Sequence, residues 1–143
     1  MTKAETVAAD HPESLVIGAD TIVVVDDHIL GKPRDVADAA RMLRMLSNRS
    51  HVVMTAVAVS LGGRTVSLVE KVTVSFRDLT KGEIARYIAT GEPMDKAGAY
   101  GIQGFGATIV RRVEGDYFAV MGLSLVRLVD LMTQVGVRYD FAR

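Results

Sequence analysis

The stretch VVMTAVAVSLGGRTVSLVEKVTVSF, residues 52–76, predicts a β-hairpin and with it the fold class. Two runs rich in β-branched residues, residues 52–61 and 65–76, lie on either side of Gly62-Gly63. A short glycine turn between two such runs is typical of strands that pair antiparallel. Because helical segments surround this hairpin, we expect an α/β domain whose twisted sheet is mixed and flanked by helices, and not a regular parallel sheet.

Upstream of the hairpin, the sequence predicts a strand, a turn and a helix. Residues 15–25 are apolar and β-branched, which indicates a buried strand, although the polar segment GADT at residues 18–21 interrupts it. Asp26-Asp27 predicts a turn into a short return strand at residues 28–30. Residues 2–9 have the pattern of a helix end. A further helix should begin at the N-cap Asp35 and carry an apolar face of Val36, Ala39, Leu43 and Leu46.

Downstream of the hairpin, a capping box of Thr80 and Glu83 predicts a short helix that ends at Gly91. Its inward residues should be Ile84, Tyr87 and Ile88. Residues 93–106 form a glycine-rich loop, residues 107–113 and 117–120 have strand patterns, and Ser124 is a candidate cap for a last helix.

Composition narrows the class of protein further. The 143 residues contain 17 basic and 17 acidic side chains and no cysteine, so neither a general attraction to nucleic acid nor a thiolate metal site is expected. No apolar run approaches the ~20 residues that cross a bilayer, and no linker or repeat divides the chain. The sequence predicts a single soluble cytoplasmic domain over residues 1–143, with neither nucleic acid nor membrane as a partner. Motifs of P-loop proteins, zinc proteases and α/β-hydrolases do not occur, and the three histidines lack metal-ligand spacing.

Asp20 is the first candidate for chemistry, because an acid within an apolar strand is costly to bury without a partner or a metal. At a strand break that faces a cleft, its carboxylate could hold a divalent cation or act as a general base on water. The alternative is a structural acid that caps a bulge or accepts hydrogen bonds from backbone amides.

Two loops supply further candidates. Gly31-Lys32-Pro33 would present Lys32 as a point charge for a phosphate, although an ordinary solvated lysine in a turn remains the simpler reading. The loop DKAGAYGIQG, residues 95–104, combines small residues that leave backbone amides open with three useful side chains. Asp95 could reach a metal, Lys96 a phosphate and Gln103 the edge of a base. The alternative for this segment is a flexible connector.

Three segments occur in an order that matches a known family. The first is VIGADTIV at residues 16–23 with LGKP at residues 30–33, and the second is the helix of residues 39–46 with SNRSHVVMT at residues 47–55. The third is DKAGAYGIQG at residues 95–104, followed by VEGDY at residues 113–117 and VMGLSL at residues 120–125. Together they resemble the Maf (septum-formation) family of nucleoside triphosphate pyrophosphatases, whose fold is like that of inosine triphosphatases, over nearly the whole chain.

This resemblance implies hydrolysis between the α- and β-phosphates of a nucleoside triphosphate with Mg²⁺ or Mn²⁺, as part of nucleotide-pool cleaning. Asp20 matches the family's catalytic acid, which activates water or holds the metal, and Lys32 matches its phosphate-binding lysine. Thr21 and Gln103 match positions linked to substrate choice. The sequence of residues 95–104 resembles the corresponding segment in the branch of the family that acts on dTTP and UTP. Lys3 matches a lysine near the nucleotide, and the family is compatible with a homodimer.

The chain departs from the family at its start, where members carry a strand and a loop of the form S-x-R-R. That motif is absent from the 143 residues. Loss of a bidentate arginine grip weakens phosphate and transition-state binding, so we expect weak activity or none from this chain. Two alternatives follow: a catalytically impaired nucleotide-binding or regulatory fragment, and a structural fragment that pairs with another chain through an incomplete sheet.

Overall fold

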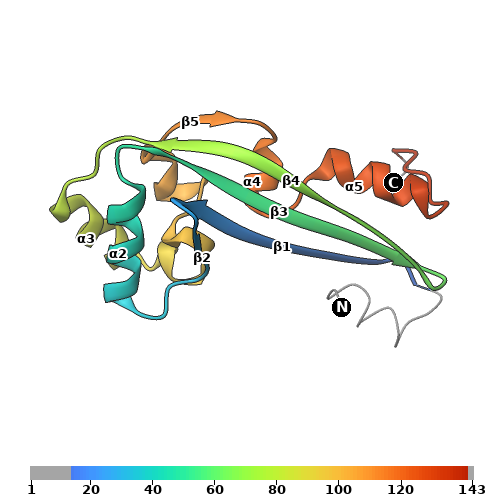
Figure 1. Ribbon diagram of the computed structural model, residues 1–143, viewed down its shortest axis with the longest axis horizontal. Coiled ribbons are helices and arrows are strands. Elements are labelled where there is room, and N and C mark those ends of the chain that lie inside the picture. The colour runs from blue at the N-terminus through green and yellow to red at the C-terminus, as the bar shows by residue number, and fades with distance from the viewer. Residues whose placement is uncertain (1–13, 142–143) are drawn as a thin grey trace.

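The computed structural model describes residues 14–141 (Figure 1). The helix end expected at residues 2–9, and Lys3 with it, lies outside the described residues. In chain order the elements are β1 (Val16–Val25), β2 (His28–Leu30), α2 (Val36–Leu46), β3 (Ser50–Leu61), β4 (Arg64–Phe76), α3 (Lys81–Ala89), the short 3₁₀ helices η1 (Glu92–Asp95), η2 (Ala97–Ala99) and η3 (Gly104–Thr108), β5 (Val110–Glu114), α4 (Tyr117–Met121) and α5 (Leu125–Gln134).

The strands form one five-stranded sheet in the order β2-β1-β3-β4-β5. Every neighbouring pair within the described residues is antiparallel. The exclusion of a regular parallel sheet is therefore confirmed, whereas the mixed strand directions predicted for the sheet are wrong. The predicted hairpin is confirmed: Leu61 pairs with Arg64, and Gly62 and Gly63 occupy the turn with φ of 58° and 80°. A turn with two positive φ angles matches the twist of the flanking strands. Glycine suits both positions because it adopts positive φ without steric cost.

Helices pack against the sheet, with α2 and α3 near its β2 end and α5 toward the β3–β4 turn (Figure 1). On β3 the alternate residues buried on one face are His51, Val53, Thr55, Val57 and Val59. Val53 belongs to a core that also includes residues of α2, α3 and α4. Val57 and Val59 instead pack against Leu131 of α5. The predicted α/β arrangement of a sheet with flanking helices is therefore confirmed.

The predicted helix signals around α2 and α3 are largely confirmed. The Asp35 carboxylate accepts a hydrogen bond from the Asp38 amide at 2.8 Å, and Thr80 and Glu83 form the reciprocal capping box. Gly91 follows α3 with a left-handed φ of 80°. One face residue was predicted wrongly, because Val36 is 61% exposed. Val36 is the first residue of α2, and the buried positions begin two residues later, at residues 38, 39, 42, 43 and 46.

The strand predicted over residues 117–120 is wrong, because these residues form the helix α4. The Asp116 carboxylate accepts a hydrogen bond from the Phe118 amide at 2.9 Å and caps this helix, and Gly122 ends it with a φ of 117°. These two caps outweigh the strand preference of an aromatic and β-branched segment. The strand expected from residue 107 begins only at Val110, since residues 107 and 108 belong to η3.

The predicted cap of the last helix is also satisfied differently. Ser124 occupies the N-cap position of α5, but its side chain makes no capping hydrogen bond there. Its hydroxyl donates to the Asp116 carboxylate instead. The start of α5 is thereby tied to the start of α4. None of the helices between residues 14 and 141 is both long and apolar enough to cross a membrane.

His51 is a buried polar residue inside this core. Its side chain is 3% exposed, its Nε2 atom lies 2.6 Å from the Tyr100 hydroxyl, and its Nδ1 atom has no partner within the described residues. The rings of Phe76 and Tyr100 meet the imidazole edge to face. Burial, with a smaller effect of the Arg49 charge, lowers the pKa of His51 from 6.5 to about 4. The imidazole is therefore neutral in the folded protein at neutral pH.

We expect His51 to destabilise the folded protein as the pH falls from 6.5 to 4. Over that range the unfolded chain binds a proton on this imidazole before the folded chain does, since the folded pKa is lower. The loss should approach about 3 kcal/mol at pH 4, and nothing should be lost above pH 7. Urea unfolding of wild type and His51→Gln across this range measures the difference. A difference between the two proteins that stays constant with pH would contradict the assignment.

Candidate active-site pocket

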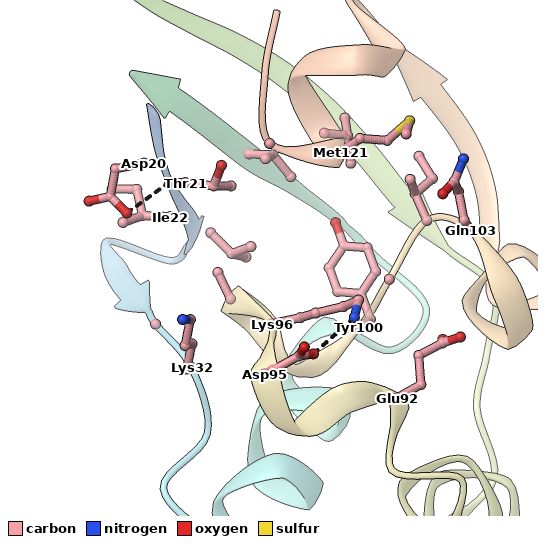
Figure 2. A pocket seen from close by; sticks show the side chains of 18 of the residues that line it. Asp20, Thr21, Ile22, Lys32, Glu92, Asp95, Lys96, Tyr100, Gln103 and Met121 are labelled. Atoms are coloured by element: carbon pink, nitrogen blue, oxygen red, sulfur yellow. Dashed lines mark hydrogen bonds and ion pairs between the residues drawn. The ribbon is translucent and has the colours of Figure 1, made fainter. Parts of the chain in front are cut away.

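A cavity of about 950 Å³ opens between β1, the η1–η3 segment and α4. All the candidate residues of the sequence analysis that lie within residues 14–141 line it, namely Asp20, Thr21, Lys32, Asp95, Lys96 and Gln103. Figure 2 shows Asp20 and Lys32 on one side, Lys96 and Tyr100 in the middle, and Gln103 on the far side near Met121. Segments far apart in sequence thus share one hollow. The position of Lys3 lies outside the described residues.

Lys32 is exposed at the mouth of the pocket, as the sequence predicts for a lysine on a stiff loop. The loop is held from both sides: Pro33 is buried, and the Gly31 carbonyl accepts a hydrogen bond from the Gly98 amide at 3.1 Å. Gly98 has a φ of 74°, and a Cβ there would lie 2.8 Å from the Val23 side chain. A glycine therefore allows η2 to lie directly on β1 and brings Lys32 beside the second loop.

Asp95 and Lys96 form an ion pair with a 2.9 Å contact between Oδ1 and Nζ. The hydrogen bond from Lys96 and then the charge of Lys96 lower the pKa of Asp95, and the Lys32 charge adds to this. The aliphatic part of Lys96 packs over Gly101, where a Cβ would come within 2.9 Å of Lys96 Cε. Two ammonium groups therefore face one carboxylate in this part of the pocket.

Asp20 is exposed, so the prediction that it lies in a buried strand is wrong. Along Val16–Val24, β1 pairs with β3 without a register shift, but β2 pairs only from Val23 onward. Within residues 14–141, the other edge of β1 beside Asp20 therefore has no strand partner, and water reaches the carboxylate. Its Oδ1 accepts a hydrogen bond from the Thr21 amide at 3.1 Å, as the structural alternative expected, although no bulge is present.

Thr21 lies on the opposite face of β1 from Asp20 and points into the pocket (Figure 2). Its hydroxyl lies 3.0 Å from that of Thr55, which donates to the Ala119 carbonyl at 2.6 Å. This chain of contacts ties α4 to the sheet and places Met121 and Gly122 in the pocket wall. Sequence reasoning missed this wall because it assigned a strand to residues 117–120. The N-cap residue Asp116 and the C-cap residue Gly122 were the signals that could have identified the helix.

The loop that carries Gln103 is closed at its base. A Cβ on Gly106 would lie 1.6 Å from the Gly101 carbonyl oxygen, so the two ends of the loop are in backbone contact. Gln103 is exposed between them and lines the pocket, and so does Glu92 of η1. Sequence reasoning missed Glu92, which follows Gly91 and looks like an ordinary acid in a turn. Its partners are at least five residues away in sequence, so no local pattern identifies it.

A divalent cation fits these side chains only in a limited way. The described residues contain no group of three or more His, Cys, Asp or Glu side chains that could hold a metal. Asp20 is exposed with only one hydrogen bond, whereas Asp95 is occupied by Lys96. One or two carboxylates suit Mg²⁺ that keeps water and substrate phosphates as its other ligands. The donors therefore fit a cation that takes most of its ligands from outside the protein, with Asp20 better placed than Asp95.

Residues 1–135 match the family model described as "Maf-like protein". The chain belongs to this family. The Maf-like chain is also similar to proteins named dTTP/UTP pyrophosphatase. It is 57% identical over 134 residues to the one from Geobacillus sp. (strain WCH70), a match that covers 94% of this chain and 72% of the relative. It is 55% identical over 137 residues to the one from Koribacter versatilis (strain Ellin345), a match that covers 94% of this chain and 70% of the relative. It is 52% identical over 134 residues to the dTTP/UTP pyrophosphatase from Bacillus cytotoxicus, a match that covers 94% of this chain and 70% of the relative.

Gly106→Ala should destabilise the Maf-like chain strongly. The added methyl group would overlap the Gly101 carbonyl, so the base of the loop must open, and we expect a loss near the upper end of overpacking costs, about 3 kcal/mol. Gly31→Ala is the matched control, since a Cβ there has no atom within 4 Å. Its unfolding free energy should stay within about 0.5 kcal/mol of wild type. Equal urea midpoints and slopes for the two variants would refute the close approach.

Proposed function

We propose that this Maf-like chain hydrolyses pyrimidine nucleoside triphosphates such as dTTP and UTP to the monophosphate and pyrophosphate. The observation that carries the proposal is the shared pocket, where three separate segments bring together an acid, two lysines and the carboxamide of Gln103. Phosphoryl chemistry needs positioning and charge neutralisation more than covalent help, and these groups supply both. The names of the relatives support the choice of substrate.

Lys32 and Lys96 are proposed to bind the phosphates. Lys32 is exposed on its loop, and Lys96 is held against Gly101 by packing of its stem. An ammonium group is a compact charge that suits phosphate oxygens. When a triphosphate enters, Lys96 can exchange the Asp95 carboxylate for phosphate oxygens. Negative charge that develops on the departing pyrophosphate would be stabilised by the same two ammonium groups.

Asp20 is proposed as the general base. Its carboxylate would take a proton from a water molecule whose oxygen attacks the α-phosphorus, while the bond from that phosphorus to the bridging oxygen breaks and pyrophosphate leaves. Asp20 lies on the opposite face of β1 from Thr21 but lines the same pocket, where β1 has no second strand partner within residues 14–141, so its exposed carboxylate is accessible to water. Bound Mg²⁺ or Mn²⁺ would supply neutralisation of phosphate charge, with Asp20 and more weakly Asp95 as its protein ligands.

Gln103 and Thr21 are proposed to select the nucleotide. The carboxamide of Gln103 offers a donor and an acceptor, which can pair with the carbonyl and the imide N–H that uracil and thymine share. Thr21 lies on the α4 side of the pocket through its contact with Thr55. We further infer that residues 1–143 act as one cytoplasmic domain. The edge of β1 that has no strand partner within residues 14–141 is a candidate contact for a homodimer.

A nucleotide-binding regulator remains the second candidate function. The observation in its favour is the Asp20 carboxylate, which is exposed and accepts a hydrogen bond from the Thr21 amide, as a structural acid would. Binding without hydrolysis separates this alternative from the enzyme.

Turnover and binding of the 143-residue chain test the proposal together. We expect Mg²⁺-dependent release of pyrophosphate from dTTP and UTP in single-turnover assays at high protein concentration. Asp20→Asn should slow this release by ~100-fold or more, because the amide cannot accept the proton, while dTTP binding by calorimetry changes little.

Asp27→Asn is the matched control, since Asp27 is an exposed acid in the β1–β2 turn outside the pocket. It should release pyrophosphate at the wild-type rate. Binding of dTTP by the wild type without release of pyrophosphate would favour the regulator. A wild type that neither binds nor hydrolyses dTTP would rule out both functions.

A further inference from the structure

Glu92 holds the Gln103 loop from inside through both of its carboxylate oxygens. Oε1 accepts a hydrogen bond from the Phe105 amide at 2.9 Å, and Oε2 accepts one from the Gly106 amide at 2.9 Å. Both amides lie on the C-terminal side of Gln103. Hydrogen bonds from backbone amides to a carboxylate are charge-assisted and stronger than neutral ones. This side of the loop is therefore fixed to η1.

Tyr87 of α3 holds the other side of the same loop. Its hydroxyl donates to Glu92 Oε2 and accepts a hydrogen bond from the Gly101 amide at 3.0 Å. The side chain is 7% exposed, and burial first, then the bond to Glu92, raises the pKa of its phenol well above the usual range. The phenol therefore keeps its proton at physiological pH, and its role as donor to Glu92 is fixed.

The residues between these two attachments have little freedom. Ile102 is buried at 8% exposure, and Gly104 has a φ of 62° and lies so close to Glu92 that a Cβ would come within 2.2 Å of Oε1. The exposed Gln103 lies between them and lines the pocket, while Glu92 lies below it in Figure 2. The path of the backbone at Gln103 is thus determined by Glu92, Tyr87 and two glycines.

We propose that Glu92 and Tyr87 are positioning residues that fix Gln103 for selection of the pyrimidine base, an inference that rests on the proposed function. A hydrogen bond to a base edge requires donor and acceptor to meet within a few tenths of an ångström of 2.9 Å. A loop already ordered before binding avoids the cost of ordering it around the ligand. Neither residue needs to touch the nucleotide for this effect.

The charge of Glu92 agrees with a positioning role. A free carboxylate in a triphosphate pocket would repel the ligand, but both oxygens of Glu92 face donors of the protein. Gln at this position has one carbonyl oxygen in place of two carboxylate oxygens, so its amide N–H₂ must face one of the loop amides. Glu92→Gln should therefore release one side of the loop while it leaves the lysines in place.

The test compares the binding of two probes with Mg²⁺ by calorimetry: α,β-imido-dUTP, which cannot be cleaved at the reacting bond, and inorganic tripolyphosphate, which has no base. We expect wild type to prefer the nucleotide by about tenfold, the value of one or two good hydrogen bonds. In Glu92→Gln the preference should fall to about twofold, with tripolyphosphate affinity within about threefold of wild type. Hydrogen exchange at the Phe105 and Gly106 amides should become faster in the same variant.

Glu114→Gln is the matched control, because Glu114 is exposed on β5 outside the pocket, and it should keep the wild-type preference. Tyr87→Phe removes the Gly101 attachment and should reduce the preference even if Glu92→Gln does not fold. A preference that survives in a folded variant overturns the inference, and so does an equal loss for both probes. A wild type that binds the probes equally overturns it and leaves the phosphate site intact. A wild type that binds neither probe overturns the proposed function itself.

Discussion

The pairing of β1 with β3 is the constraint on which the pocket depends. It runs without a register shift from Val16 to Val24, and it assigns Asp20 and Thr21 to opposite faces of the sheet. Thr21 then meets Thr55 and α4, while Gly98 brings η2 onto Val23 of the same strand. The loops that carry Lys32 and Lys96 and the helical wall are thus both attached to one strand. A slip of one residue would exchange the two faces and separate these groups.

The pocket divides into a charged part and a rigid part. Lys32, Lys96 and Asp95 form the charged part, where contacts are exposed and can exchange partners as a polyanion enters. Gln103 belongs to the rigid part, which is held by buried Tyr87 and by backbone amides on Glu92. This division suits a nucleotide, because phosphates require charge and tolerate movement, whereas a base edge is recognised by hydrogen bonds of defined direction.

Local signals in the sequence predicted much of the fold, and nonlocal contacts account for what it missed. The Gly62-Gly63 hairpin and the capping box of Thr80 and Glu83 are specified by adjacent residues and were predicted correctly. The helix α4 was mistaken for a strand, since its caps had less weight than its β-branched and aromatic residues. The exposure of Asp20 depends on which strands lie on each side of β1, which no single segment encodes.

The candidate side chains were found by their chemistry, whereas the residues that support them were not. Lysines and a glutamine in glycine-rich loops indicate phosphate and base binding even without coordinates. By contrast, Glu92 and Tyr87 act through Gly101, Phe105 and Gly106, and only the folded chain brings these together.

The contact between Gly106 and the Gly101 carbonyl also limits how this pocket can be re-engineered. In a library that randomises the whole loop, most variants would be unable to close the base of the loop. Diversity confined to residue 103 and to the opposing α4 wall keeps the scaffold intact, so new nucleobase preferences should be sought there.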